Sequence, residues 1–288
     1  MSDMLRRNLA PLSAEAWQEV DETAVRVIKG QLSARALVDF SGPHGFELGA
    51  VNLGRLELGK ASAGDGVPWG TRQVLPLIEL RLPVVLKQME LDNLSRGCKD
   101  SDLSPLEDAA RKLAHFEESV VYNGFPAGQI NGILSGASHA GIKLPTDPEQ
   151  LPQAVAQAIQ AISAAGISGP YALVLGSHAY YPLMQAGRGG YPPRRIIRDM
   201  LEGPILWSPA LDGGVVLSTR GGDFQLTVGQ DIAIGYASHD REKVELYLVE
   251  SFTFRILQPA AAVPLTAQAG GSQRPGQPSA RRNSSRGR

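Results

Sequence analysis

The chain has 288 residues, of which 43% are hydrophobic and 20% are charged, a composition that excludes disorder along its whole length. We expect no membrane-spanning helix, because no apolar run approaches the roughly 20 residues that such a helix needs. No apolar stretch follows Arg6 and Arg7, so we expect no secretory signal at the start. Cys98 is the single cysteine, which excludes an intramolecular disulfide and a multi-cysteine zinc site and fits a reducing cytoplasm.

Charge is unevenly distributed along the chain, although the net charge is only −1. Glu250 is the last acidic residue, and the C-terminal segment ends with a group of basic residues: Arg274, Arg281, Arg282, Arg286 and Arg288. The acidic body argues against a nucleic-acid-binding protein. Residues 260–288, rich in Gly, Ser, Pro, Gln and Arg, are predicted to be disordered. This tail is either a solvated terminus or an electrostatic arm for RNA or acidic surfaces.

Four helices are predicted from apolar spacing and end signals. The first covers residues 14–31, with Ser13 as its N-cap. The second begins at Ser104, which we interpret as a capping residue followed by Pro105 at the first helical position. The third covers residues 149–165, and a short fourth helix starts near Pro193.

Two segments, residues 74–86 and 244–256, alternate apolar and polar side chains over about 13 residues, about twice the usual strand length. Strands of this length indicate a flat, extended subunit that pairs with neighbouring chains. Pro76 and Pro83 place the first of them at a sheet edge or bulge. Between the first helix and these strands, residues 54–70 are rich in glycine, which predicts either a mobile surface hairpin or an arm ordered by another subunit.

Shorter strands are predicted at residues 171–175, 215–219, 224–228 and 231–236. Helices and strands are mixed without a regular βαβ alternation, so the fold class is α+β.

Motifs for catalysis are absent from the sequence: it has no HExxH, GxSxG, Walker or CxxC pattern. Residues 187–190 read as a loop, and Ser177 and His178 form no nucleophile pair because neighbours on a helix point apart. His115 is expected on a solvated helix face together with Glu117 and Glu118.

Seven motifs occur in a fixed order along the chain. They are LAPLSAEAWQEVDETA, GRLELG, LPLIELR, MELDNLSRG, SPLEDAARKLAHFEE, GISGPYALVLG and RGGDFQLTVGQDIAIGY. In this order they closely resemble the encapsulin nanocompartment shell proteins, also called the linocin-type bacteriocin family (family 1 encapsulins). The resemblance spans residues 4–259, and the tail lies outside it.

This resemblance implies a tailed-phage major capsid protein fold of the Hong Kong 97 type, with a peripheral domain, an axial domain and an extended loop. The expected parts are an N-terminal helix and the start of the peripheral domain (1–50), the extended loop (51–72), the peripheral domain with its spine helix (73–124), the axial domain (125–223), the C-terminal peripheral strands (224–259) and the disordered basic tail (260–288).

The resemblance also implies a self-assembling, non-enzymatic cytoplasmic shell of about sixty copies or an icosahedral multiple. Such a shell would enclose a cargo protein held by a C-terminal targeting peptide, with a role in iron storage or oxidative stress. The cargo would be a ferritin-like iron-storage protein or a dye-decolourising peroxidase. The alternatives are a linocin-type bacteriocin or protease activity and a phage capsid protein. Neither a nucleic-acid partner nor a membrane is expected.

Site residues follow from the same resemblance. The cargo peptide would bind Ile28, Arg35, Asp39, Ile232, Ile234 and Tyr236. The loop lining the five-fold pore would be Met184, Gln185, Ala186, Gly187, Arg188, Gly189, Gly190 and Tyr191, where Arg188 suggests a cationic pore that favours anions. Some relatives stack a flavin on a tryptophan, and Arg81 matches an arginine near that site. Met89 occupies the position of the tryptophan here, and the lack of an aromatic ring argues against flavin binding. No metal site is expected.

Overall fold

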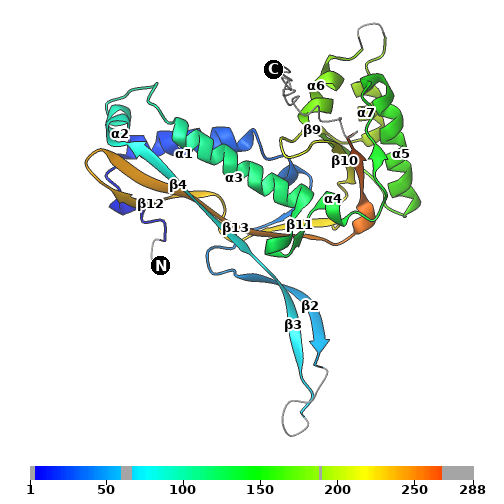
Figure 1. Ribbon diagram of the computed structural model, residues 1–288, viewed down its shortest axis with the longest axis horizontal. Coiled ribbons are helices and arrows are strands. Elements are labelled where there is room, and N and C mark those ends of the chain that lie inside the picture. The colour runs from blue at the N-terminus through cyan, green and yellow to red at the C-terminus, as the bar shows by residue number, and fades with distance from the viewer. Residues whose placement is uncertain (1–3, 60–66, 188–189, 268–288) are drawn as a thin grey trace, which may run out of the picture.

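A computed structural model describes residues 4–59, 67–187 and 190–267 of the chain. Its two five-stranded sheets lie at opposite ends of the molecule, and a two-stranded arm projects from the middle (Figure 1). The α+β class predicted from the sequence is confirmed. The described part of the chain contains no helix that is both long and apolar enough to cross a membrane.

The first sheet is built around β13 (Lys243–Ile256), the longest strand of those described. Its strand order is β1 (Asp39–Ser41), β11 (Phe224–Val228), β13 and β12 (Ala233–His239), and β4 (Ile78–Lys87) also pairs with β13. Three helices pack on one face: α1 (Ala14–Lys29), α2 (Gln88–Ser95) and α3 (Ser104–Asn123). Each helix packs apolar side chains into the core around Leu246, and Val20 of α1 and Leu106 of α3 are fully buried there.

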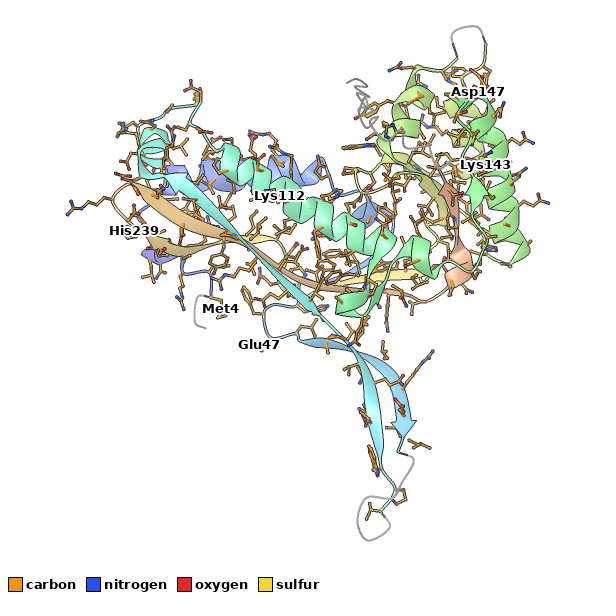
Figure 2. The ribbon with its side chains drawn as sticks, in the orientation of Figure 1. Met4, Glu47, Lys112, Lys143, Asp147 and His239 are labelled. Atoms are coloured by element: carbon orange, nitrogen blue, oxygen red, sulfur yellow. The ribbon has the colours of Figure 1, made fainter. Side chains whose placement is uncertain are left out.

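The opposite face of this sheet receives the N-terminal segment. Figure 2 shows Met4 and Lys112 of α3 on opposite sides of the sheet. The hydroxyl of Tyr247 donates to the carbonyl of Met4 at 3.0 Å, and the amide of Tyr236 donates to the carbonyl of Leu5 at 2.8 Å. These two bonds hold the start of the chain against β12 and β13.

The second sheet has the strand order β7 (Ile142–Lys143), β14 (Ala262–Thr266), β10 (Gly214–Ser218), β8 (Tyr171–Leu175) and β9 (Ile205–Trp207). It is accompanied by α5 (Leu151–Ala164), α6 (Ser177–Gln185) and α7 (Pro193–Leu201) (Figure 1). Strands β8 and β10 lie in the interior of this end of the molecule, and every residue of both strands is buried. Shorter elements connect the two ends: β5 (Gly124–Phe125), β6 (Ile130–Asn131) and α4 (Ile133–Gly136).

The prediction that disorder begins at residue 260 is wrong for residues 260–267. A 3-10 turn over Pro259–Ala261 leads into β14, whose Val263 pairs with Val216 of β10. Ala262, Val263 and Leu265 are buried in the core of the second sheet. The segment therefore returns to the end of the molecule assigned above to the axial domain. The remaining residues of the tail lie outside the described part.

The long strand predicted over residues 74–86 is two strands with a break at Leu77. β3 (Gly70–Pro76) pairs with β2 (Ala50–Leu58) to form the projecting arm, and β4 runs in the first sheet. The amide of Leu77 donates to the carbonyl of Gly49 at 3.0 Å, which fixes the base of the arm. The edge position indicated by Pro83 is confirmed, because β4 pairs with β13 and with no other described strand.

All four predicted helices are present, but some of their first and last residues differ from the predicted bounds. Ser104 is the first helical residue of α3 and not its cap; its amide and hydroxyl both donate to the carboxylate of Asp102, and Leu103 occupies the capping position. A 3-10 turn (Pro148–Gln150) precedes α5, because the Asp147 side chain caps the amide of Glu149. Helices α2, α4 and α6 were not predicted.

Candidate functional site

Arg35 lies at the centre of a cluster of three acids from α3, β13 and the loop before β12. Its Nε and Nη2 donate to the two carboxylate oxygens of Glu117 at 2.8 and 2.6 Å. The same Nη2 donates to Glu250 at 2.7 Å, and Nη1 donates to Asp231 at 2.9 Å. Glu117 and Glu250 are fully buried, whereas the Arg35 side chain keeps 20% of its surface exposed. One side chain thus joins three separate segments and still reaches the surface.

The electrostatics of this cluster follow from one cation facing three acids. Burial lowers the pKa of Arg35, but the hydrogen bond and charge of Glu117, with the charges of Glu250 and Asp231, outweigh it and raise the pKa. Burial, followed by the charge of Glu117, raises the pKa of Glu250 well above its ordinary value. Since Oε2 of Glu250 is buried without a partner among the described residues, we interpret Glu250 as the acid of the cluster that keeps its proton.

A third buried acid, Glu118, fixes the backbone beside Arg35. Its carboxylate accepts from the amides of Ser33 and Ala34 at 2.8 and 2.7 Å and from the hydroxyls of Ser33 and Ser208 at 2.7 and 2.6 Å. Burial raises the pKa of Glu118, and the hydrogen bonds from Ser208, Ala34 and Ser33 partly oppose this. The turn that carries Arg35 is therefore held rigidly against α3.

The apolar residues assigned above to cargo binding share one core, and Ile232 joins it to the cluster, because its amide donates to the carboxylate of Asp231 at 2.8 Å. Ile28 of α1 and Ile232, which precedes β12, are half-buried and pack on the core beneath α1. Ile234 and Tyr236 belong to that core, with 4% and 9% of their surface exposed. Ile28 and Ile232 thus keep some apolar surface accessible, whereas Ile234 and Tyr236 lie in the interior of the same core.

Asp39 does not join this group. Its carboxylate accepts from the amide of Gly222 at 2.6 Å, and its backbone pairs with Gln225 at the edge of the first sheet. Its neighbour Phe40 does face the cluster, since the Arg35 guanidinium lies 5.3 Å from the centre of the Phe40 ring. The structure gives Asp39 a role in closing the turn before β11.

The loop assigned to the five-fold pore joins α6 to α7. Met184 and Gln185 end α6, and Ala186 and Gly187 follow without regular structure. Tyr191 is 58% exposed and its hydroxyl donates to Asp199 at 2.9 Å. Arg188 and Gly189 lie outside the described residues.

The two residues considered for flavin binding do not form a stacking site. Met89 is 62% exposed on α2 and offers a thioether where the stacking would need an aromatic ring. The guanidinium of Arg81 already lies 3.7 Å from the centre of the Tyr247 ring. The residues present therefore do not fit a flavin.

Two kinds of catalytic site were considered in the described part of the chain: a metal site and a Ser177–His178 pair. No group of three or more His, Cys, Asp or Glu side chains there could hold a metal ion. The hydroxyl of Ser177 accepts from the indole of Trp207 at 3.0 Å, and no hydrogen bond links it to His178. This agrees with the sequence interpretation of Ser177 and His178.

Comparisons with known proteins decide the family. The family profile described as "Encapsulating protein for peroxidase" matches residues 1–253. The type 1 encapsulin shell protein of Rhodococcus erythropolis is 43% identical over 261 residues, which cover 91% of this chain and 98% of that protein. The chain belongs to the encapsulin shell protein family. The type 1 encapsulin shell protein of Rhodospirillum rubrum is 44% identical to it, over 92% of this chain and 96% of that one.

Solved structures show the same fold at low sequence identity. The virus-like particle of Pyrococcus furiosus matches this encapsulin with a TM-score of 0.60 at 20% identity, over 88% of this chain and all of that one. The capsid of Myoviridae phage XM1 matches with a TM-score of 0.56 at 14% identity, over 82% of this chain and 92% of that one. The tailed-phage capsid fold expected from the sequence is confirmed.

Sequence reasoning missed the acids around Arg35 in this encapsulin. Glu117 and Glu118 were expected on a solvated face, and both are fully buried; the expectation holds for the exposed His115. One signal was present: Glu250 interrupts an otherwise apolar row of alternate residues in β13. A carboxylate in a buried row needs a cation, and Arg35 is that cation.

Proposed function

We propose that this encapsulin assembles into a closed icosahedral shell of about sixty copies or a multiple of that number. One observation supports this most directly. The projecting arm exposes a row of large apolar side chains, with exposed fractions of 58% at Leu56, 72% at Leu58 and 51% at Val74. Exposed apolar surface of this extent is typical of a protein interface.

The arm is suited to contact a second copy of the chain. β2 and β3 pair only with each other among the described strands, so their outer edges offer free backbone donors and acceptors. Such edges gain affinity by adding strands from a neighbour. The arm of one subunit would therefore lie on its neighbour and link the subunits of the shell.

The shell would take up a cargo protein through a peptide at the C-terminus of that cargo, bound on the surface near Arg35. Ile28 and Ile232 offer half-buried apolar surface for apolar side chains of the peptide. Arg35 keeps part of its guanidinium accessible and so can bind peptide carbonyl groups. Ile234, Tyr236 and Asp39 would act indirectly by supporting this surface and the turn beside it.

The proposed cargo is a dye-decolourising peroxidase or a ferritin-like iron-storage protein. The family profile, with its description as an encapsulating protein for peroxidase, supports the first of these. We place the shell in the cytoplasm, in keeping with a chain whose one cysteine is Cys98. In this assignment the shell has no catalytic activity of its own, and the chemistry belongs to the cargo.

Small molecules would enter through pores at the five-fold axes, lined by residues 184–191. Arg188 would make these pores cationic, which favours the passage of anions. The variant Arg188→Glu should slow the uptake of anionic substrates by a loaded shell and speed that of cations. Equal uptake rates in the two shells would contradict this role.

Negative-stain electron microscopy of the purified chain tests the proposed assembly. Uniform hollow particles are expected, and their diameter gives the number of subunits. A monodisperse monomer or dimer would contradict the proposal. Particles filled with DNA would favour the phage capsid alternative, and proteolysis by intact shells without cargo would favour the bacteriocin or protease alternative.

A further inference from the structure

A cavity of about 390 Å³ lies between α6, α7 and the start of β9 in the second sheet. The described residues that line it divide into two kinds. One side is cationic, with Arg194, Arg195 and Arg198, all of them on α7. The other side is largely apolar, with Tyr180 and Met184 of α6 and Ile205 of β9. No carboxylate is among these lining residues.

The three arginines keep their charge without an acidic partner. None of them forms an ion pair with a described residue, although eight such pairs are formed in the described parts of the molecule. Asp199, one turn after Arg195, accepts its hydrogen bond from Tyr191 instead. Arg195 lies 6.0 Å from the centre of the Tyr191 ring, a contact that leaves its charge uncompensated.

This arrangement costs stability in the absence of a ligand. Arg194 and Arg198 are four residues apart on α7, and like charges at this spacing destabilise a helix. The three side chains line a shared concave space and are all exposed to solvent, so an anion can reach them. An anion in the cavity would remove this repulsion and gain several charge-assisted hydrogen bonds at once.

We propose that this cavity binds a phosphate group, either as free phosphate or as part of a small phosphorylated organic molecule. Guanidinium groups match phosphate because each can donate two parallel hydrogen bonds to its oxygens. Arg194 and Arg198 lie one turn apart on the same face of α7 and can donate to the same phosphate group, and Arg195 adds a third positive charge beside them. The aromatic ring of Tyr180 and the side chains of Met184 and Ile205 would contact the organic part. Met184 belongs both to this cavity and to the loop assigned above to the five-fold pore, but phosphate binding by the cavity does not require the shell to form.

Calorimetric titration of the purified full-length protein with inorganic phosphate, at constant ionic strength, tests this site. We expect saturable binding of one phosphate per chain, competition by sulfate and no competition by chloride. Arg198→Gln should weaken binding at least tenfold, and Arg198→Lys should weaken it less, because a lysine keeps the charge but loses the bidentate geometry. Titration with phenyl phosphate distinguishes a phosphorylated organic ligand from free phosphate. If phenyl phosphate binds at least threefold more tightly than inorganic phosphate, the ligand is an organic phosphate; if the two bind equally, the ligand is free phosphate.

Arg241→Gln is the matched control, since Arg241 is an exposed arginine in the loop after β12 and forms no ion pair with a described residue. It should bind phosphate as the unmodified protein does. The arginines at the C-terminus are present in every variant and add the same background to each titration. Absence of saturable binding, or equal binding by Arg198→Gln and Arg241→Gln, would overturn the proposal. If Arg198→Gln does not fold, unchanged binding by Arg198→Lys and by Arg194→Lys would overturn it.

Discussion

Glu117 and Glu250 bring two fully buried carboxylates onto the same guanidinium group. The Nη2 atom of Arg35 lies 2.6 Å from an oxygen of Glu117 and 2.7 Å from an oxygen of Glu250. One cation cannot neutralise two buried anions, and Asp231 adds a third acid to the cluster. Burial, followed by the charge of Glu117, raises the pKa of Glu250, so we interpret Glu250 as the acid of the cluster that keeps its proton.

Stability should therefore depend on the protonation of Glu250. The pKa of Glu250 in the folded state lies above its ordinary value of 4.5. At a pH between these two pKa values, the folded state therefore binds a proton that the unfolded state has lost. This contribution is complete below the unfolded pKa and is lost as the pH rises through the folded pKa, with a slope of about 1.4 kcal/mol per pH unit. Glu250→Gln mimics the protonated acid and should remove this part of the pH dependence, measured by urea unfolding across the pH range.

The matched control for this prediction is Glu245→Gln. Glu245 lies on the same strand, but it is exposed and accepts from the hydroxyl of Ser238. It should leave the pH profile unchanged, because its carboxylate faces water. If Glu250→Gln follows the same pH profile as the unmodified protein, Glu250 is ionised in the folded state and the interpretation of the cluster is wrong.

Removal of the Arg35 side chain should reduce the stability of the fold far more than removal of an exposed arginine. Arg35→Ala leaves the Glu117 carboxylate buried without a counter-charge and removes the hydrogen bond to Glu250, which should cost about 3–5 kcal/mol of unfolding free energy. Arg26 serves as the control: its side chain is 65% exposed and pairs with Glu107 at 3.3 Å, so Arg26→Ala should cost less than about 1 kcal/mol. Urea unfolding followed by tryptophan fluorescence measures both, and similar losses would contradict the importance of the buried cluster.

The segment after Pro259 should contribute to folding through β14. Val263 is fully buried and pairs with Val216, so Val263→Ala should cost about 2 kcal/mol through the lost contacts and the cavity. Thr266 is exposed at the end of the same strand, and Thr266→Ala should change stability by less than about 0.5 kcal/mol. Thermal unfolding compares the two variants, and a neutral Val263→Ala would show that β14 adds nothing to the core.

The arm should be needed for assembly and dispensable for the fold of the subunit. Leu58→Ser removes an apolar side chain that is 72% exposed, so the folded subunit loses little, whereas a contact between subunits loses buried area. Met89→Ser removes a 62% exposed side chain on α2 and is the control. Light scattering should show smaller particles for Leu58→Ser alone, with unchanged circular dichroism. Full-size shells from Leu58→Ser would argue against the arm as a subunit contact.

Cargo binding is best tested at Ile232 and not at Ile234. Ile234→Asp would place a carboxylate in the core, so a loss of cargo would reflect unfolding as much as lost binding. Ile232 is half-buried at the surface, and Ile232→Asp should reduce cargo uptake at least tenfold in shells that still form. The measurement is co-purification of a fluorescent reporter that carries the C-terminal peptide of the cargo encoded beside the shell gene.

Ile196→Asp is the control for cargo binding. Ile196 is 38% exposed on α7, the helix beside the second sheet. It lies away from Arg35, so a charge there should not change reporter uptake. Full retention of the reporter by Ile232→Asp shells would remove Ile232 from the proposed binding surface.

The sequence predicted well those elements that local patterns determine. The strands at residues 171–175 and 224–228 have the expected bounds, and α1 begins after Ser13, whose side chain accepts from the amide of Ala16. Helix spacing, caps and alternation act between residues a few positions apart, so they can be read from the chain. The ordered motifs supplied the family, and with it the capsid fold.

Other features depend on partners far away in the chain, and only the tertiary structure decided them. The break at Leu77 requires the carbonyl of Gly49, and β14 becomes a strand because β10 offers it a free edge. The burial of Glu117 and Glu250 requires Arg35, whose sequence neighbourhood gives no sign of an acidic cluster. Such contacts are set by how the elements pack, because a buried charge is stable only where the fold brings it an opposite one.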